Sequence, residues 1–198
     1  MTRAGDRYTI RPGRASDATE LVRLHAAVQL QAGTAGQPHP GIAAWVDGLL
    51  AGHPSVAPDD FLVAEELATG RPVASLVGLR QDWSLAGVRL PVVQVELVGT
   101  APEHRGNRLT DRLLAALHER CAADGVAVQV IEGIPHFYRR FGYHYALANG
   151  GASTVPAAVL PAAEQGGPDD APGVLTVDPA TVANAEALAG IDRQLADG

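Results

Sequence analysis

The chain has 198 residues, of which 46% are hydrophobic, and its formal net charge is -7. This length suits one globular domain with residues to spare, and the hydrophobic fraction excludes wholesale disorder. All 15 lysine-or-arginine positions are arginine, which excludes chemistry that needs a lysine Schiff base or a Walker lysine. The single cysteine, Cys121, excludes an internal disulfide and a cysteine-rich zinc site.

The charge is divided unevenly along the chain. Residues 1–150 contain 14 arginines and 15 acidic residues, whereas residues 151–198 contain one arginine and seven acidic residues. Neither part has the basic stripe that nucleic-acid binding requires, so no nucleic-acid partner is expected. The first residues carry no apolar signal segment, and no apolar run reaches membrane-spanning length. We therefore expect a cytoplasmic protein without a membrane partner.

The first part of the chain predicts a strand and two helices. Residues 8–11 have strand character, and a polar residue at 16 or 17 can cap a helix whose apolar positions at 18–24 follow helical spacing. A loop rich in Gly and Pro covers residues 31–41. A second amphipathic helix then runs over residues 42–50 and stops near Gly52.

Strands dominate the middle of the chain. Residues 61–66 and 72–83 have strand composition, and a turn leads into the strongest strand, residues 90–100. Because side chains alternate along a strand, Gln94 and Glu96 are expected on one face of it.

The last part of the domain predicts a parallel strand pair. A helix with an apolar stripe covers residues 107–124, and residues 126–131 form a continuous apolar strand. A short helix at residues 135–141 and a strand at 143–148 follow. Strand, helix and strand over residues 90–131 make a βαβ unit, so its two strands should be parallel neighbours. Short turns join most other strands, which predicts an α/β fold with a mixed sheet.

Beyond residue 150 the composition changes. Residues 1–150 are predicted to form one domain, residues 151–173 a linker rich in Gly, Pro and Ala, and residues 174–198 a tail with a strand at 174–177 and a helix at 180–196. The tail matches the start of the chain at several positions with a constant offset of 167 residues. The identical pairs are Thr9 and Thr176, Pro12 and Pro179, Ala18 and Ala185, and Leu21 and Leu188.

Two interpretations of this tail stay open. In an alanine-rich chain such pairs also arise by chance, so the tail is either the start of a second copy of the domain or a coincidence. A lone strand at residues 174–177 needs a sheet edge to satisfy its backbone. That edge belongs either to its own chain or to a neighbouring copy, and the second arrangement makes a homodimer.

The segment that ends one strand and opens the next helix carries candidate binding chemistry. Exposed N–H groups at a helix start, together with the helix dipole, form an anion site. Arg105, Gly106 and Arg108 lie in this segment, and that composition suits a diphosphate. The alternative is an ordinary strand-to-helix turn with solvated arginines.

Residues 98–109 and the later run Phe-Tyr-Arg-Arg-Phe-Gly-Tyr at 137–143 together resemble the GNAT (Gcn5-related N-acetyltransferase) superfamily. There a strand ending in V-x-V-x-P is followed by R-x-x-G-x-G/A and later by F-Y-x-x-x-G-F/Y. The resemblance covers about residues 8–148. It is nearest to the Eis-like tandem branch, through the Leu-Pro pair at 90–91, the A-P-x-H-R run at 101–105 and Y-x-R-F-G-Y at 138–143.

The resemblance implies a GNAT-like α/β fold whose central parallel strands splay apart, with helices on both sides. Tyr138 is the implied general acid that protonates the departing thiolate, and Glu96 is our candidate general base, acting through a water. Acetyl-CoA, or another acyl-CoA, is the implied co-substrate, and no metal is expected. Its pantetheine arm would bind to the backbone of Val98, Gly99 and Thr100, and its pyrophosphate to Arg105, Gly106, Asn107, Arg108, Leu109 and Thr110.

The implied reaction is direct transfer of an acetyl or other acyl group to a primary amine of a small molecule or peptide. The acceptor pocket is expected among the first two helices, the loop at 31–41 and the hairpin at 83–90. Its candidate lining residues are His39, Trp45, Asp82 and Trp83.

The alternative function is a GNAT-like binding or structural module that does not turn over. Arg108 and Thr110 favour it, because the family has glycine at the first of these positions and glycine or alanine at the second. Asp111 would also compete with phosphates at the helix start. For Glu96 the alternative is a structural carboxylate paired with arginine, and for Tyr138 it is a packed aromatic.

Overall fold

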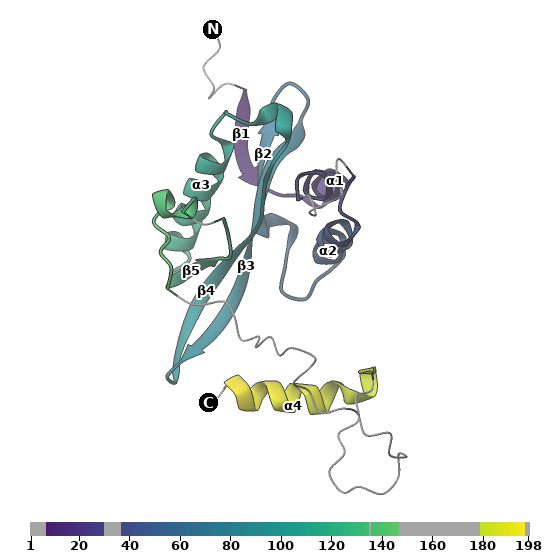
Figure 1. Cartoon of the computed structure of the whole chain (residues 1–198), viewed down its shortest axis with the longest axis vertical. Helices are drawn as coiled ribbons and strands as arrows, with labels where there is room; N and C mark the ends of the chain where they lie inside the picture. Colours follow the sequence, from purple (N-terminus) through teal and green to yellow (C-terminus); the bar gives the residue numbers. More distant parts are fainter. Residues whose placement is uncertain (1–6, 30–36, 135, 147–178, 197–198) are drawn as a thin grey trace, which may run out of the picture. The chain divides into compact units, whose positions relative to one another are not determined.

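A computed structural model describes residues 7–29, 37–134, 136–146 and 179–196 (Figure 1). The chain divides into two compact units, Met1–His144 and Tyr145–Gly198. The described part of the second unit contains a 3₁₀ turn, η7 (Val182–Asn184), and the helix α4 (Ala185–Ala196). Among the described residues, no helix combines the length and apolar character that crossing a membrane requires.

The first unit is built on a five-stranded sheet in the order β1-β2-β3-β4-β5. The strands are β1 (Tyr8–Pro12), β2 (Phe61–Glu66), β3 (Arg71–Leu85), β4 (Val88–Thr100) and β5 (Val128–Ile131). All neighbours are antiparallel except β4 and β5, which are parallel. The predicted α/β class with a mixed, mostly antiparallel sheet is therefore confirmed.

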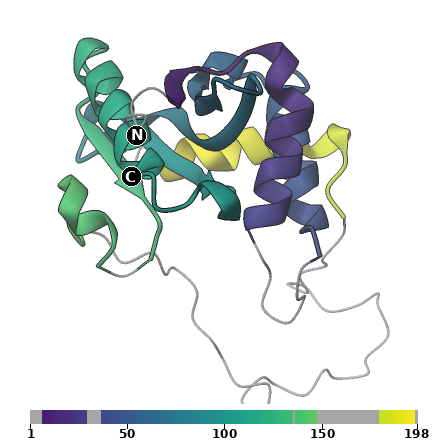
Figure 2. The same ribbon diagram turned by 90° about the horizontal axis from the view of Figure 1, so that it is seen from above.

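Helices cover both faces of this sheet. The helices α1 (Ala18–Val28) and α2 (Pro40–Leu50) lie on one face and α3 (Leu109–Ala123) on the other (Figures 1 and 2). Because side chains alternate along a strand, each strand contributes residues to the core on both faces of the sheet. Two consecutive residues of β3 show this. Leu76 belongs to the core under α3, and Val77 to the core under α1 and α2.

The hairpin of β3 and β4 is longer than the rest of the sheet and reaches beyond it (Figure 1). Its tip is a two-residue turn, Ala86 and Gly87, in which both residues have positive φ, 50° and 77°. Positive φ at both central residues characterises the type I′ turn, whose backbone twist matches that of the flanking antiparallel strands. The predicted turn before the strongest strand is thus present.

Three predicted elements differ from the structure. The helix predicted from residue 107 begins at Leu109, because Arg108 has left-handed backbone angles. The short helix predicted at 135–141 is a single 3₁₀ turn, η5 (Tyr138–Phe141).

The strand predicted at 143–148 is wrong over its described part, since residues 143–146 are irregular. Gly142 turns the chain back with φ 93°, and the hydroxyl of Tyr143 contacts Gln129 and His118 instead of continuing a sheet. The strand predicted at 174–177 lies outside the described residues.

Candidate active site

A β-bulge in β4 opens the sheet at the centre of the candidate site. Glu96 pairs with Val77 and Gly99 with Ser75, so β4 has one residue more than β3 over this stretch. Leu97 in the bulge has φ 54°, an uncommon value for a non-glycine residue. The pairing of β4 with β5 ends at Val95, so the remaining residues of β4 continue without β5 beside them.

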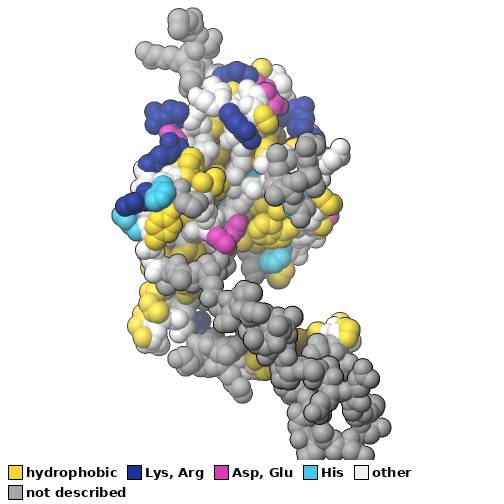
Figure 3. Space-filling view, in the orientation of Figure 1, with side chains coloured by type: hydrophobic (Ala, Val, Ile, Leu, Met, Phe, Trp, Pro, Cys, Tyr) yellow, Lys and Arg dark blue, Asp and Glu magenta, His cyan; other side chains and the backbone are white. Residues whose placement is uncertain are grey.

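A cavity of about 190 Å³ lies at this opening. It brings together Glu96 on β4 and Tyr138 on η5, the two predicted catalytic residues. Figure 3 shows acidic side chains between hydrophobic patches on the viewed face. The lining residues are Gln29, Ile42, Trp45, Val95, Glu96, Leu97, Val98, Ile131, Glu132, Gly133, Ile134 and Tyr138.

The structure separates the residues predicted to line the acceptor pocket. Trp45 lines the cavity, but Trp83, His39 and Asp82 are not among its lining residues. His39 instead accepts a hydrogen bond from the N–H of Ile42 at the start of α2, 3.3 Å away. His39 therefore caps α2, and the position of the acceptor pocket stays a prediction.

Tyr138 is held in an aromatic cluster beside a glycine. Its ring lies 4.9 Å from that of Phe137 in an edge arrangement and 6.1 Å from that of Tyr143. A Cβ on Gly133 would lie 2.6 Å from Cδ2 of Tyr138 and closer still to Cε2. Burial, and secondarily the negative charge of Glu96, raises the pKa of the Tyr138 phenol. The phenol therefore stays protonated at neutral pH and is able to donate a proton.

Gly133 is a residue of the candidate site that sequence reasoning missed. Nothing in the run Glu-Gly-Ile after β5 distinguishes it from an ordinary turn glycine. Gly133 matters because the ring of Tyr138 packs against it, and this contact is visible only in the folded chain.

The three residues predicted to bind pantetheine have different surroundings. Val98 lines the cavity, and its carbonyl accepts a hydrogen bond from Nε2 of Gln29 at 3.2 Å. Gly99 faces α1, where a Cβ would lie 2.6 Å from Cγ2 of Val28. Thr100 pairs with Ala74 at the end of β4. Helix packing is therefore the local reason for glycine at position 99.

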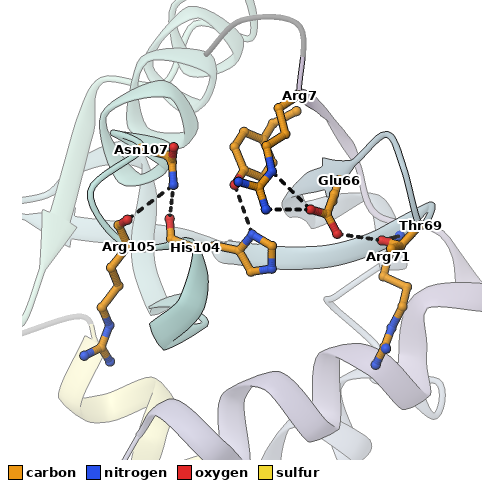
Figure 4. A network of polar contacts seen from close by, with 8 residues as sticks. Arg7, Glu66, Thr69, Arg71, His104, Arg105 and Asn107 are labelled. Atoms are coloured by element: carbon orange, nitrogen blue, oxygen red, sulfur yellow. Dashed lines mark hydrogen bonds and ion pairs between the residues drawn. The ribbon is translucent and has the colours of Figure 1, made fainter. Parts of the chain in front are cut away.

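The predicted pyrophosphate loop is anchored on one side and exposed on the other. His104, in the 3₁₀ turn η4 (Pro102–His104), is buried, and its Nδ1 lies 3.0 Å from the hydroxyl of Tyr8 on β1. Nδ2 of Asn107 donates to the carbonyls of His104 and Arg105, at 2.9 and 3.2 Å (Figure 4). The guanidinium of Arg105 points away from these contacts (Figure 4).

Arg108 has the backbone conformation that favours glycine. Its φ is 54°, so this position does need left-handed angles, as glycine in the family motif suggests. Nε of Arg108 donates to Asp111 at 2.8 Å, and its side chain is 82% exposed. Arg140 of η5 also pairs with Asp111, at 3.0 Å. Two arginines thus neutralise the carboxylate that was expected to compete with phosphates.

The fold has counterparts among known proteins. The family model described as acetyltransferase (GNAT) domain matches residues 9–146 of the sequence. No curated protein matches the chain. A GNAT family acetyltransferase from Brucella melitensis, solved in complex with acetyl-CoA, is 23% identical with a TM-score of 0.56, over 74% of this chain and 91% of that one.

Two longer proteins are also similar in structure. Eis1 from Mycobacterium abscessus is 16% identical with a TM-score of 0.53, over 69% of this chain and 31% of that one. A conserved protein of unknown function from Enterococcus faecalis V583 is 18% identical with a TM-score of 0.54, over 68% and 32%. The chain thus spans about a third of the length of these two relatives. At these identities the similarity shows a shared fold.

Proposed function

The chain belongs to the GNAT acetyltransferase family, and from this premise we propose that it is an enzyme that transfers an acetyl or other acyl group from acyl-CoA to a primary amine of a small molecule or peptide. The observation that carries the proposal is the meeting of Glu96 and Tyr138 in one cavity at the opening between β4 and β5. A carboxylate and a protonated phenol are the two groups that direct aminolysis of a thioester needs.

Each group has a distinct task in the proposed reaction. Glu96 removes a proton from the incoming ammonium, directly or through a water, and leaves a neutral amine that attacks the thioester carbon. The C–N bond forms, the C–S bond breaks, and Tyr138 gives its hydroxyl proton to the departing thiolate. The nitrogen then loses its second proton, which restores the phenol of Tyr138 and leaves a neutral amide. Holding both groups beside one cavity lowers the barrier mainly through orientation.

The residues present suit an acyl-CoA, which supplies the activated acyl group when bound. The backbone of β4 after Val95 has no β5 neighbour. Those of its polar groups that Gln29 and Arg105 do not already bind are available to an amide-containing arm. The first N–H groups of α3 have no partner within the helix and favour an anion. Arg105 adds an exposed positive charge. These features support binding of an acyl-CoA at this site.

Thermal denaturation with acetyl-CoA tests binding, because a ligand of the native state alone raises the Tm. We expect a concentration-dependent rise, and no shift at millimolar acetyl-CoA would contradict the proposal. Turnover is measured as free thiol released from acetyl-CoA in the presence of a panel of primary amines.

The acid role of Tyr138 is tested in the same assays. Tyr138→Phe should keep the thermal shift and lose turnover by about 100-fold, the lower limit for a general acid. Tyr143→Phe is the matched control, since Tyr143 is not among the cavity-lining residues. Equal turnover of wild type and Tyr138→Phe would refute the acid role. Binding without turnover in the wild type would favour the non-catalytic module.

We also propose that the tail repeats the start of the first unit. The 3₁₀ turn η2 (Ala15–Asp17) and α1 recur as η7 and α4 at the same offset of 167 residues. The N–H of Arg14 donates to Asp17 at 2.8 Å, and the N–H of Thr181 donates to Asn184 at 2.9 Å. These two contacts join equivalent positions, which supports a repeat over a coincidence.

Truncation tests the role of this tail. A variant that lacks residues 165–198 is compared with the full chain by light scattering and thermal denaturation. A dimer that becomes a monomer supports strand pairing between copies. A lower Tm with an unchanged number of subunits supports strand pairing within one chain. An unchanged number of subunits together with an unchanged Tm would contradict both.

A further inference from the structure

Four polar side chains form a continuous hydrogen-bonded row on the α1/α2 face of β3 and β4. Nε1 of Trp83 donates to Oε1 of Gln81 at 2.6 Å, and Nε2 of Gln81 donates to Oε1 of Gln94 at 2.7 Å. Nε2 of Gln94 then donates to Oε1 of Glu96 at 2.7 Å. We call this row the amide chain. It extends from the projecting hairpin to the candidate base.

Strand geometry explains why these four side chains meet. Residues two apart on a strand share a face, which brings Trp83 beside Gln81 and Gln94 beside Glu96. The register sets Gln94 opposite Leu79 and Gln81 opposite Val92, so the two glutamines are diagonal neighbours. Long side chains bridge such diagonals.

The two ends of the amide chain fix the direction of every hydrogen bond. An indole N–H only donates, and an ionised carboxylate only accepts. The amide of Gln81 must therefore turn its oxygen toward Trp83, and that of Gln94 must turn its nitrogen toward Glu96. Reversing either amide would set like groups against each other at both of its contacts.

The carboxylate of Glu96 is consequently held by one oxygen. Oε1 accepts from Gln94, whereas Oε2 has no hydrogen-bond partner among the described residues. We propose that the amide chain positions Glu96, so that Oε2 is the oxygen available in the cavity to accept the amine proton. This inference rests on the proposed function of Glu96 as the base, and Gln94, Gln81 and Trp83 are positioning residues.

Kinetics separate a positioning role from a merely structural one. Gln94→Leu should lower kcat about tenfold, since misplacing a reacting group by about 1 Å can cost about 100-fold, with an unchanged thermal shift by acetyl-CoA. Gln129→Leu is the matched control, because Gln129 is a part-buried glutamine on β5 that contacts Tyr143 instead. The assay is thiol release with the amine from the panel that reacts fastest.

The same change is then made in a Glu96→Gln background. There Gln94→Leu should cause no further loss, since no carboxylate remains to be positioned. An equal loss in both backgrounds, or no loss in either, would overturn the inference. Full activity of Glu96→Gln alone would instead refute the base, which distinguishes failure of the proposed function from failure of the amide chain.

Nuclear magnetic resonance tests the amide chain without any substrate. The protein has two tryptophans, so its indole N–H region holds two signals, and Trp45→Phe identifies that of Trp83. Gln81→Leu should move the Trp83 signal upfield and speed its exchange with water. Glu96→Ala should also move it, whereas Glu132→Ala, which removes another carboxylate of the same cavity, should not. A Trp83 signal that is identical in wild type and Gln81→Leu would overturn the inference.

Discussion

His25 makes the stability of the fold depend on pH. Its side chain lies in α1 with no exposed surface, and Nε2 is 2.7 Å from the hydroxyl of Ser75 on β3. Nδ1 has no hydrogen-bond partner among the described residues. Burial lowers the pKa of His25 from 6.5 to about 4. The folded protein therefore resists a proton that the unfolded chain accepts readily.

The sign and size of the effect follow from linkage. Above pH 6.5 the histidine is neutral in both states, and its full contribution to stability is present. Between pH 6.5 and about 4 the unfolded state binds one proton more, so stability falls as pH falls, by about 1.4 kcal/mol per unit. The total loss is about 3 kcal/mol at pH 4, with no further loss below.

Urea denaturation at pH 7, 6, 5 and 4 measures this loss, and His25→Gln supplies the control. The variant keeps a polar side chain of similar size but cannot titrate in this range. Carboxylates titrate equally in both proteins, so the difference between the two curves isolates His25. We expect the wild type to lose about 3 kcal/mol more than His25→Gln between pH 7 and 4. Parallel curves would refute the argument.

Three glycine-related substitutions test the site and its supports. Gly133→Ala should push the Tyr138 ring aside and lower kcat at least tenfold while the acetyl-CoA thermal shift persists, and wild-type kcat would contradict this. Arg108→Gly should raise the free energy of unfolding by about 1 kcal/mol in urea denaturation, because glycine removes the cost of left-handed angles; a lower stability would argue against strain there. Gly99→Ala should lower the free energy of unfolding by about 1–3 kcal/mol through overpacking against Val28. An unchanged urea midpoint would show that α1 shifts at little cost.

Much of the fold could be predicted because its signals are local. The helix at α3 has a clear apolar stripe, and the buried residues Leu113, Leu114 and Leu117 are three of its members. The predicted strand at 90–100 lies within β4, since a run rich in Val fits a pleated, half-buried surface. The strand expected at 143–148 failed because Tyr143 suits a strand by composition but packs against Tyr138 instead.

The sequence by itself determined the family, the order of elements from β1 to β5 and the two candidate catalytic residues, because periodicity and short motifs are recorded in neighbouring positions. Only the tertiary structure decided how they meet. The bulge at Leu97 depends on the register between β3 and β4, and the approach of Gly133 to Tyr138 depends on a turn that folds back. The amide chain joins Gln81 to Gln94 across two strands. These contacts join residues that are far apart in the sequence, so no local stretch of sequence predicts them.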